Sequence, residues 1–133
     1  MLSVFPDLLL FGIVAPTILR IAAGIFFIML AVHHTRAKDA ISSTSFPIVG
    51  VMGSAAVWIS VVADIALGAL LLIGLFTQVA ALLGFLAAMK LAILRRRYPM
   101  VAPHGRVAYF LLAAICLSLM LTGAGFYAFD LPL

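Results

Sequence analysis

The stretch that decides the fold covers residues 54–75 and reads SAAVWISVVADIALGALLLIGL. Its only charged side chain is Asp64, which lies near the middle. A segment of this length and composition is typical of a membrane-spanning helix. An ionised side chain at that depth is costly and is found mainly where it pairs with another group or faces a polar cavity. Asp64 therefore predicts a membrane protein with a polar interior.

The composition of the whole chain supports this prediction. Of its 133 residues, 67% are hydrophobic and only 9% are charged, whereas charged residues make up about a quarter of an ordinary soluble domain. The net charge is +4, but so apolar a chain offers little basic surface to phosphates, and we expect no nucleic-acid binding. With Cys116 as its single cysteine, the chain can form neither an intrachain disulfide nor a cysteine-based metal site.

Four apolar segments approach the length that a spanning helix requires, about 20 residues. They cover residues 6–34, 54–74, 77–94 and 107–123. Each is apolar around its whole circumference, as membrane helices are. Because no linker or low-complexity stretch separates them, we expect a single domain: an all-α, integral membrane four-helix bundle over residues 1–133.

The loop charges predict how this bundle lies in the membrane. Basic residues gather in two connections: Arg36 and Lys38 in the first, and Arg95, Arg96, Arg97 and Arg106 in the third. Since cytoplasmic loops carry the excess of Lys and Arg, both termini are expected on the outer, periplasmic side. We expect Lys90 to extend its ammonium to the membrane interface. The arginine run at 95–97 is expected at the same interface, against anionic lipids.

Arg20 in the first segment and Asp64 in the second are opposite charges in neighbouring antiparallel spans. At about 1.5 Å of rise per residue their depths match, so we expect an ion pair. Ser60, Asp64 and Gly68 follow at intervals of four and share one helix face. Two interpretations stay open: the pair only fixes the helix register, or it lines a pocket for a quinone carbonyl or a small anion. In the second, the ligand-binding residues are Arg20, Asp64, His34, Ser60 and Gly68.

His33 and His34 end the first segment. Adjacent helical residues project about 100° apart, so the two cannot readily ligate one metal. A haem would need a second axial ligand, which only His104, in a loop, could provide; we expect no metal. His34 lies closer to the face of Arg20. A histidine at a helix C-terminus interacts favourably with the helix dipole; the alternative is a proton donor or acceptor beside a quinone.

Four stretches of the chain form a recognisable combination. Residues 64–83, DIALGALLLIGLFTQVAALL, place an acidic residue before a Gly-Leu-rich run that ends in Gly-Leu-Phe-Thr. Residues 19–29, LRIAAGIFFIM, open with Leu-Arg-x-x-x-Gly, and His34 is followed four residues later by Lys38. Residues 121–130, LTGAGFYAFD, contain Gly-x-Gly-x-Tyr-x-x-Asp. Together these stretches resemble the DoxX family of small four-helix integral membrane proteins over nearly the whole chain.

The resemblance implies a role beside a membrane redox system, because DoxX-like proteins include subunits linked to quinone reduction. Asp64 stands where the family has a glutamate. Related proteins with thiol chemistry carry paired cysteines, which this chain lacks. We therefore expect an accessory subunit without catalytic residues of its own, in a bacterial-type inner (plasma) membrane. It would contact quinone or lipid headgroups, with membrane lipids and a larger membrane complex, or further copies of itself, as partners.

Two other functions stay open. A purely structural subunit that packs on a larger membrane complex would suit the apolar faces rich in Leu, Phe and Ala. A small-solute transporter ranks third, because four short helices leave little room for alternating access and no pair of broken helices is evident.

Overall fold

The computed structural model describes residues 11–12, 14–42, 45–46, 50–51, 54–99, 101–123 and 125. Its elements in chain order are α1 (Val14–Arg36), α2 (Lys38–Ser42), β1 (Ser45–Phe46), β2 (Gly50–Val51), α3 (Ser54–Ile73), α4 (Thr77–Leu94) and α5 (Arg106–Thr122). The two-residue strands pair antiparallel between α2 and α3. Among the described residues the regular structure is otherwise helical, which confirms the all-α prediction.

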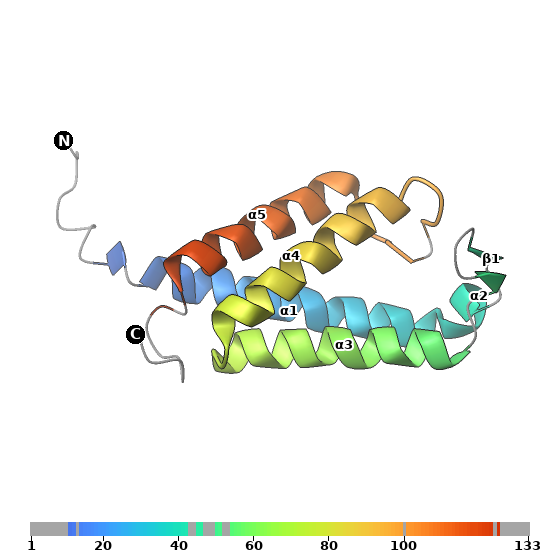
Figure 1. Cartoon of the computed structure of the whole chain (residues 1–133), viewed down its shortest axis with the longest axis horizontal. Coiled ribbons are helices and arrows are strands. Elements are labelled where there is room, and N and C mark those ends of the chain that lie inside the picture. The colour runs from blue at the N-terminus through green and yellow to red at the C-terminus, as the bar shows by residue number, and fades with distance from the viewer. Residues whose placement is uncertain are drawn as a thin grey trace.

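The long helices form two antiparallel pairs (Figure 1). In the first pair α1 lies along α3, and in the second α4 lies along α5 and crosses the first pair at an angle. The turn at residues 74–76 joins α3 to α4, and the two helices diverge from it. At the far end, α2 and the connection between α4 and α5 lie near the last turn of α1.

The turn between α3 and α4 depends on left-handed backbone conformations. Gly74 has a φ of 77° and Phe76 a φ of 48°. Glycine adopts such a φ without steric cost, whereas phenylalanine adopts it only with some steric strain. The amide groups of Gly74 and Leu75 both donate to the backbone oxygen of Leu70, which closes the end of α3. This tight reversal sets the direction in which α4 leaves.

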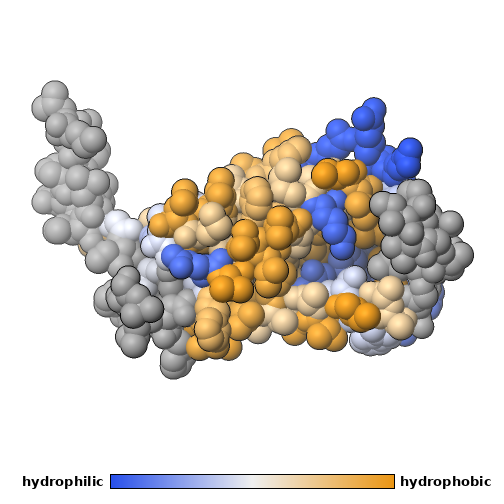
Figure 2. Space-filling view, in the orientation of Figure 1, coloured by the Kyte–Doolittle hydropathy of each residue, from blue (hydrophilic) through white to orange (hydrophobic). Residues whose placement is uncertain are grey.

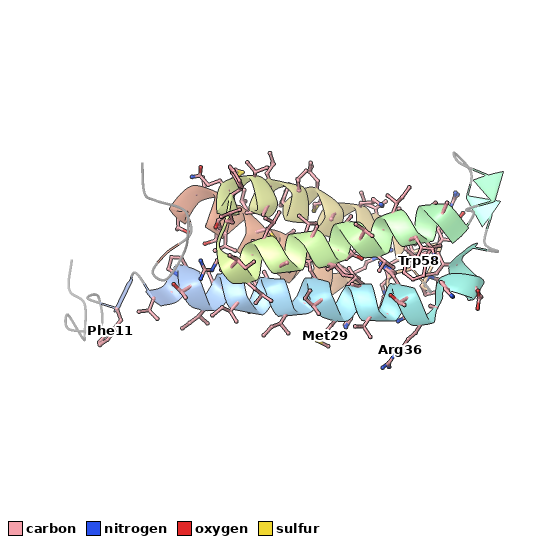
Figure 3. The ribbon with its side chains drawn as sticks, turned by 90° about the horizontal axis from the view of Figure 1, so that it is seen from below. Phe11, Met29, Arg36 and Trp58 are labelled. Atoms are coloured by element: carbon pink, nitrogen blue, oxygen red, sulfur yellow. The ribbon has the colours of Figure 1, made fainter. Side chains whose placement is uncertain are left out.

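Three helices, α1, α3 (from Ala55) and α4, are long and apolar enough to cross a membrane, and the 17-residue α5 is a shorter apolar helix. Large apolar side chains cover the outside of the molecule: Ile18, Ile25, Met29, Ile59, Val62, Leu86, Ile93, Val107, Leu111 and Leu121. Figure 2 shows this hydrophobic surface, and Figure 3 shows Met29 pointing away from the bundle. Because such a surface is suited to lipid rather than water, the structure supports the predicted membrane protein.

The first helix differs from the prediction at both ends. We expected it over residues 6–34, but the described helix runs from Val14 to Arg36, and residues 6–10 lie outside the described residues. Pro16 is the third residue of α1 and costs no internal hydrogen bond, because the N–H groups of the first turn have no partner within a helix. The other three predicted segments agree with α3, α4 and α5 to within one residue.

The core combines a few large side chains with many small ones. Phe27, Leu30, Leu71, Tyr109 and Leu119 are fully buried. Between them lie buried alanines: Ala23, Ala80, Ala81, Ala88 and Ala113. Small residues let helix backbones approach closely, and such packing holds helices together in a membrane. This close packing places the helix backbones side by side and can hold polar groups in position inside the bundle.

Candidate functional site

His34 and Asp64 form a polar centre inside the bundle. The Nδ1 atom of His34 lies 2.7 Å from the Oδ2 atom of Asp64. Both residues are buried, with exposed fractions of 5% and 7%. His34 comes from the last turn of α1 and Asp64 from the middle of α3, so this hydrogen bond joins the two helices. Hydrogen bonds in which one partner is ionised have such short distances.

A second hydrogen bond fixes the proton on the other nitrogen of the imidazole ring. The Nε2 atom of His34 lies 2.9 Å from the backbone oxygen of Val101. A carbonyl oxygen only accepts, so Nε2 carries a hydrogen and donates it. The contact between Nδ1 and Oδ2 needs a further proton, which belongs either to the imidazole or to the carboxyl group. With the proton on Nδ1 the pair consists of an imidazolium and a carboxylate, and with the proton on Oδ2 both groups are uncharged. The net charge of the pair is zero in either form.

The structure contradicts the predicted ion pair between Arg20 and Asp64. Fourteen residues of α1 separate Arg20 from His34, the residue that contacts Asp64. At about 1.5 Å per residue this separation is about 21 Å along the helix. The prediction was wrong because it matched the depths of the two residues without knowing how far α1 and α3 are shifted along each other. Gly24 packs against Gly68, so Arg20, four residues before Gly24, lies level with the part of α3 that is about eight residues, or about 12 Å, from Asp64. Arg20 is buried, but in another part of the bundle.

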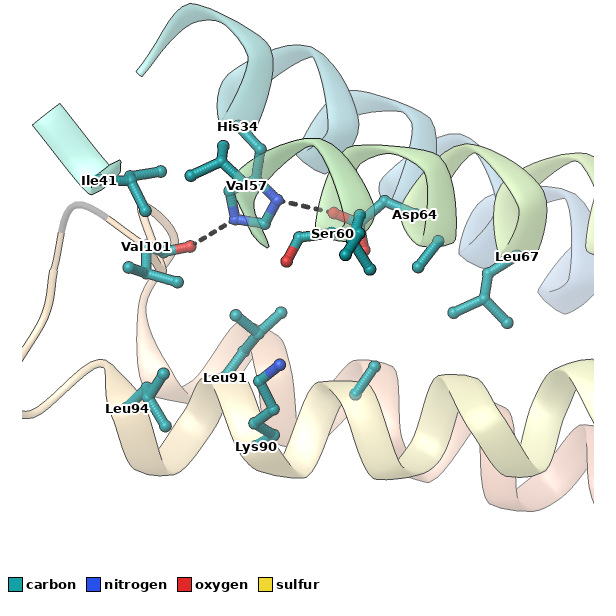
Figure 4. A pocket seen from close by; sticks show the side chains of 13 residues that line it. His34, Ile41, Val57, Ser60, Asp64, Leu67, Lys90, Leu91, Leu94 and Val101 are labelled. Atoms are coloured by element: carbon teal, nitrogen blue, oxygen red, sulfur yellow. Dashed lines mark hydrogen bonds and ion pairs between the residues drawn. The ribbon is translucent and has the colours of Figure 1, made fainter. Parts of the chain in front are cut away.

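A cavity of about 230 Å³ lies between α3 and α4, beside the His34–Asp64 pair (Figure 4). Four of its thirteen lining residues are polar: His34, Ser60, Asp64 and Lys90. The remaining nine are apolar and include Leu91 on the wall formed by α4. The cavity thus offers a few polar groups within a mostly apolar lining, as ligand sites do.

Ser60 and Asp64 share the cavity face of α3, as the four-residue spacing predicted. The hydroxyl of Ser60 donates to the backbone oxygen of Ala56 at a distance of 3.2 Å. A hydroxyl oxygen also accepts, so this group can still receive a hydrogen bond from a ligand. The Oδ1 atom of Asp64 is not used in the bond to His34 and is a second acceptor.

Gly68 lies outside the lining of the cavity, although we predicted it as a ligand-binding residue. A Cβ atom at this position would stand 3.0 Å from the backbone oxygen of Gly24 and 2.7 Å from the Cδ1 atom of Ile28. Gly68 therefore faces α1, and its role is to allow the close approach of the two helices.

Lys90, predicted at the membrane interface, is exposed near the end of α4 and also takes part in the candidate site. Its side chain lines the cavity and rises from α4 toward α3 (Figure 4). Of the neighbouring arginines, Arg95 donates to the backbone oxygen of Ala102, while Arg96 and Arg97 are exposed. The arginines thus keep the surface position expected of interface residues, and Lys90 joins the polar groups of the candidate site.

Sequence reasoning missed the second wall of the cavity. Ala87, Leu91 and Leu94 recur at intervals of three and four, and Lys90 stands beside them on the cavity side of α4. This spacing is a signal that Lys90 belongs to an inward-facing stripe. Val101 contributes its backbone oxygen to His34, and no side-chain pattern could have shown that contact.

Within the described part of the chain, no group of three His, Cys, Asp or Glu side chains is placed to hold a metal ion. Comparison of the chain with models of known protein families, with curated proteins and with solved structures found no significant match. The geometry of the site is therefore the basis on which a function can be proposed.

Proposed function

We propose that this chain is a multi-pass membrane protein whose cavity binds the polar head of a quinone, or of a lipid with a similar single-ring head. In this proposal it acts as an accessory subunit of a quinone-linked membrane redox complex and has no catalytic residues of its own. The observation that carries the proposal is the buried hydrogen bond between His34 and Asp64 at the wall of a mostly apolar cavity.

The size and polarity of the cavity favour a small amphipathic head. Its volume of about 230 Å³ is below the roughly 300–1,000 Å³ of pockets that enclose whole drug-sized ligands. A single ring fits such a volume, whereas a long apolar tail does not. Lys90 can donate a hydrogen bond to a ring oxygen, and Asp64 and Ser60 can each accept one from a ring hydroxyl.

The lining of the cavity extends to the outside of the bundle, where the apolar tail of a bound molecule can lie. Ile59, which lines the cavity, is 70% exposed, and Ala63 and Lys90 are exposed as well. In a membrane, exposed apolar residues of this kind face lipid. The lining therefore reaches the lipid-facing surface between α3 and α4, and a bound molecule could keep its tail in the bilayer.

We propose further that α5 crosses the membrane as the fourth helix of a bundle. Its 17 residues are at the lower end of the range of about 17–25 that a spanning helix needs. The last turn of α1, with Arg36, and the connection after α4, with Arg96 and Arg97, lie at the same end of the molecule (Figure 1). Because cytoplasmic loops carry the excess of Lys and Arg, this end would face the cytoplasm of a bacterial-type inner membrane, with both termini outside. The resemblance to DoxX proteins supports the link to a redox complex, with membrane lipids as further partners.

The proposal is tested by titrating the purified protein with a short-chain quinone and following the fluorescence of Trp58. This residue is the single tryptophan of the chain and lies on α3 two residues before Ser60, outside the cavity lining. A quinone bound in the cavity therefore quenches its indole fluorescence through space, by energy transfer, rather than by contact. Ala63→Phe fills the mouth of the cavity and should abolish saturable quenching. Ala66→Phe, on the same helix and also exposed but outside the lining, is the matched control and should bind normally. Equal quenching in the two variants would contradict the proposed site.

A purely structural subunit is the second candidate, favoured by the large apolar side chains that cover the outside of the bundle. Purification in mild detergent separates the two functions. A structural subunit would co-migrate with partner proteins and show no saturable quenching of Trp58. The third candidate, a small-solute transporter, would show uptake into vesicles that contain the purified protein.

A further inference from the structure

We infer that the cavity selects a ligand head with one negative charge over a neutral head of the same shape. The inference rests on the proposed function, because it concerns the same cavity. The geometry behind it is the placement of Lys90 on α4, across the cavity from the hydrogen-bonded pair of His34 and Asp64.

The pair of His34 and Asp64 carries no net negative charge while both of its hydrogen bonds hold. Nε2 donates to Val101. The 2.7 Å contact between Nδ1 and Oδ2 contains a proton, because two lone pairs at that distance would repel each other. With this one shared proton the pair is neutral, and with a second proton, on Oδ1, it is positive. The carboxylate of Asp64 is thus already balanced by its own partner.

Lys90 therefore supplies the net charge of the cavity. Its positive charge acts on the imidazole of His34, and its side chain extends toward α3 (Figure 4). Among the described residues of the lining, Asp64 is the only acid. Lys90 is exposed but also lines the cavity, so an anionic head placed beside its ammonium gains a direct charge pair that a neutral head lacks.

These features define the ligand by its chemistry. It has an apolar tail, a head that fits about 230 Å³, and one ionised oxygen that accepts a hydrogen bond from Lys90. Two kinds of molecule share this chemistry. One is a hydroxyquinone, whose ring hydroxyl is ionised at neutral pH, and the other is a fatty acid, which presents a carboxylate.

The experiment compares an alkyl hydroxybenzoquinone, which is anionic, with its methyl ether, which is neutral and has nearly the same shape. Quenching of Trp58 reports the affinity of each. We expect the anionic compound to bind about tenfold more tightly than the ether, as one direct charge pair would produce. Oleate is then added as a competitor: displacement assigns the site to carboxylates as well, and lack of displacement restricts it to the ionised ring.

Variants of Lys90 test whether this residue is the cause. Lys90→Gln should bring the ratio of the two affinities close to one. Continued binding of the ether by this variant would show that the variant is folded. Lys90→Arg should preserve the preference. Arg97→Gln removes a cation outside the cavity lining and should change nothing.

Three results would overturn the inference. If the ether binds as tightly as the anion to the unmodified protein, or if Lys90→Gln leaves the ratio unchanged, the cavity does not select by charge, although the proposed quinone site stands. If neither compound gives saturable quenching, the proposed function fails and this inference fails with it.

Discussion

Gly24 of α1 and Gly68 of α3 meet backbone to backbone where the two helices pack. A Cβ atom on either residue would stand 3.0 Å from the backbone oxygen of the other. The same close approach carries the end of α1 along α3, where His34 reaches Asp64. The glycine contact is therefore a structural condition for the polar centre, even though Gly68 lies outside the cavity lining.

Gly68→Val should destabilise the protein, because the new side chain would collide with Ile28 and with the backbone of Gly24. Overpacking of this kind costs about 1–3 kcal/mol. Thermal unfolding in detergent would measure the loss. Gly105→Val is the control: nothing lies within 4 Å of a Cβ at that position, and its φ of −62° is open to any residue. A control as unstable as the Gly68 variant would contradict the interpretation.

Two substitutions of Asp64 should distinguish the contribution of its hydrogen bond to the free energy of unfolding from the contribution of its charge. Asp64→Ala leaves Nδ1 of the buried His34 without its carboxylate, at a cost of about 1–3 kcal/mol. Asp64→Asn should cost less, because the amide can donate to Nδ1 of a neutral imidazole whose Nε2 still donates to Val101. Chemical unfolding of both variants in detergent would measure the difference. Arg97→Ala, at an exposed charged position after α4, is the control and should stay within about 0.5 kcal/mol of the unmodified protein. An Asn variant less stable than the Ala variant would contradict this account.

The long helices could be predicted from the sequence because their signals are local. Apolar runs of spanning length located α3, α4 and α5 to within one residue. The start of α1 could not be located in the same way, since apolar composition continues through residues 6–13 whether or not they are helical. Pro16 is equally compatible with a kink and with a first turn. The start of α1 does not explain the wrong partner for Asp64, which came from the alignment of α1 with α3.

The candidate site was only partly predictable because its members come from separate segments. Asp64 and Ser60 were identified by depth and spacing on one helix, and His34 was included as a proton carrier. The pairing of His34 with Asp64 depends on how α1 and α3 align, which no local pattern contains. Lys90 was interpreted as an interface residue because its position near the end of α4 fits both a surface and a cavity.

The hydrogen bond from His34 to Val101 should hold the connection between α4 and α5 against the bundle. His34→Ala removes this bond together with the bond to Asp64. The bond to Val101 alone contributes about 1 kcal/mol, so the connection should open at least about fivefold more often. Trypsin cleavage at the exposed Arg96 and Arg97 would report the opening as a proportional rise in rate. His33→Ala changes the adjacent histidine, which is only partly buried, and should leave the cleavage rate unchanged. Equal rates in the two variants would show that His34 does not secure this connection.

The turn at residues 74–76 and the connection after α4 should lie on opposite sides of the membrane. Phe76 is exposed at one end of α4 and Arg96 at the other. In a Cys116→Ala background, which removes the single cysteine, Phe76→Cys should react with an impermeant maleimide added outside spheroplasts. Arg96→Cys should react only in inverted vesicles, because loops rich in arginine stay in the cytoplasm. The background protein should take up no label from either side. Labelling of both positions from one side would mean that α4 does not cross the membrane, and the reverse pattern would place the termini in the cytoplasm.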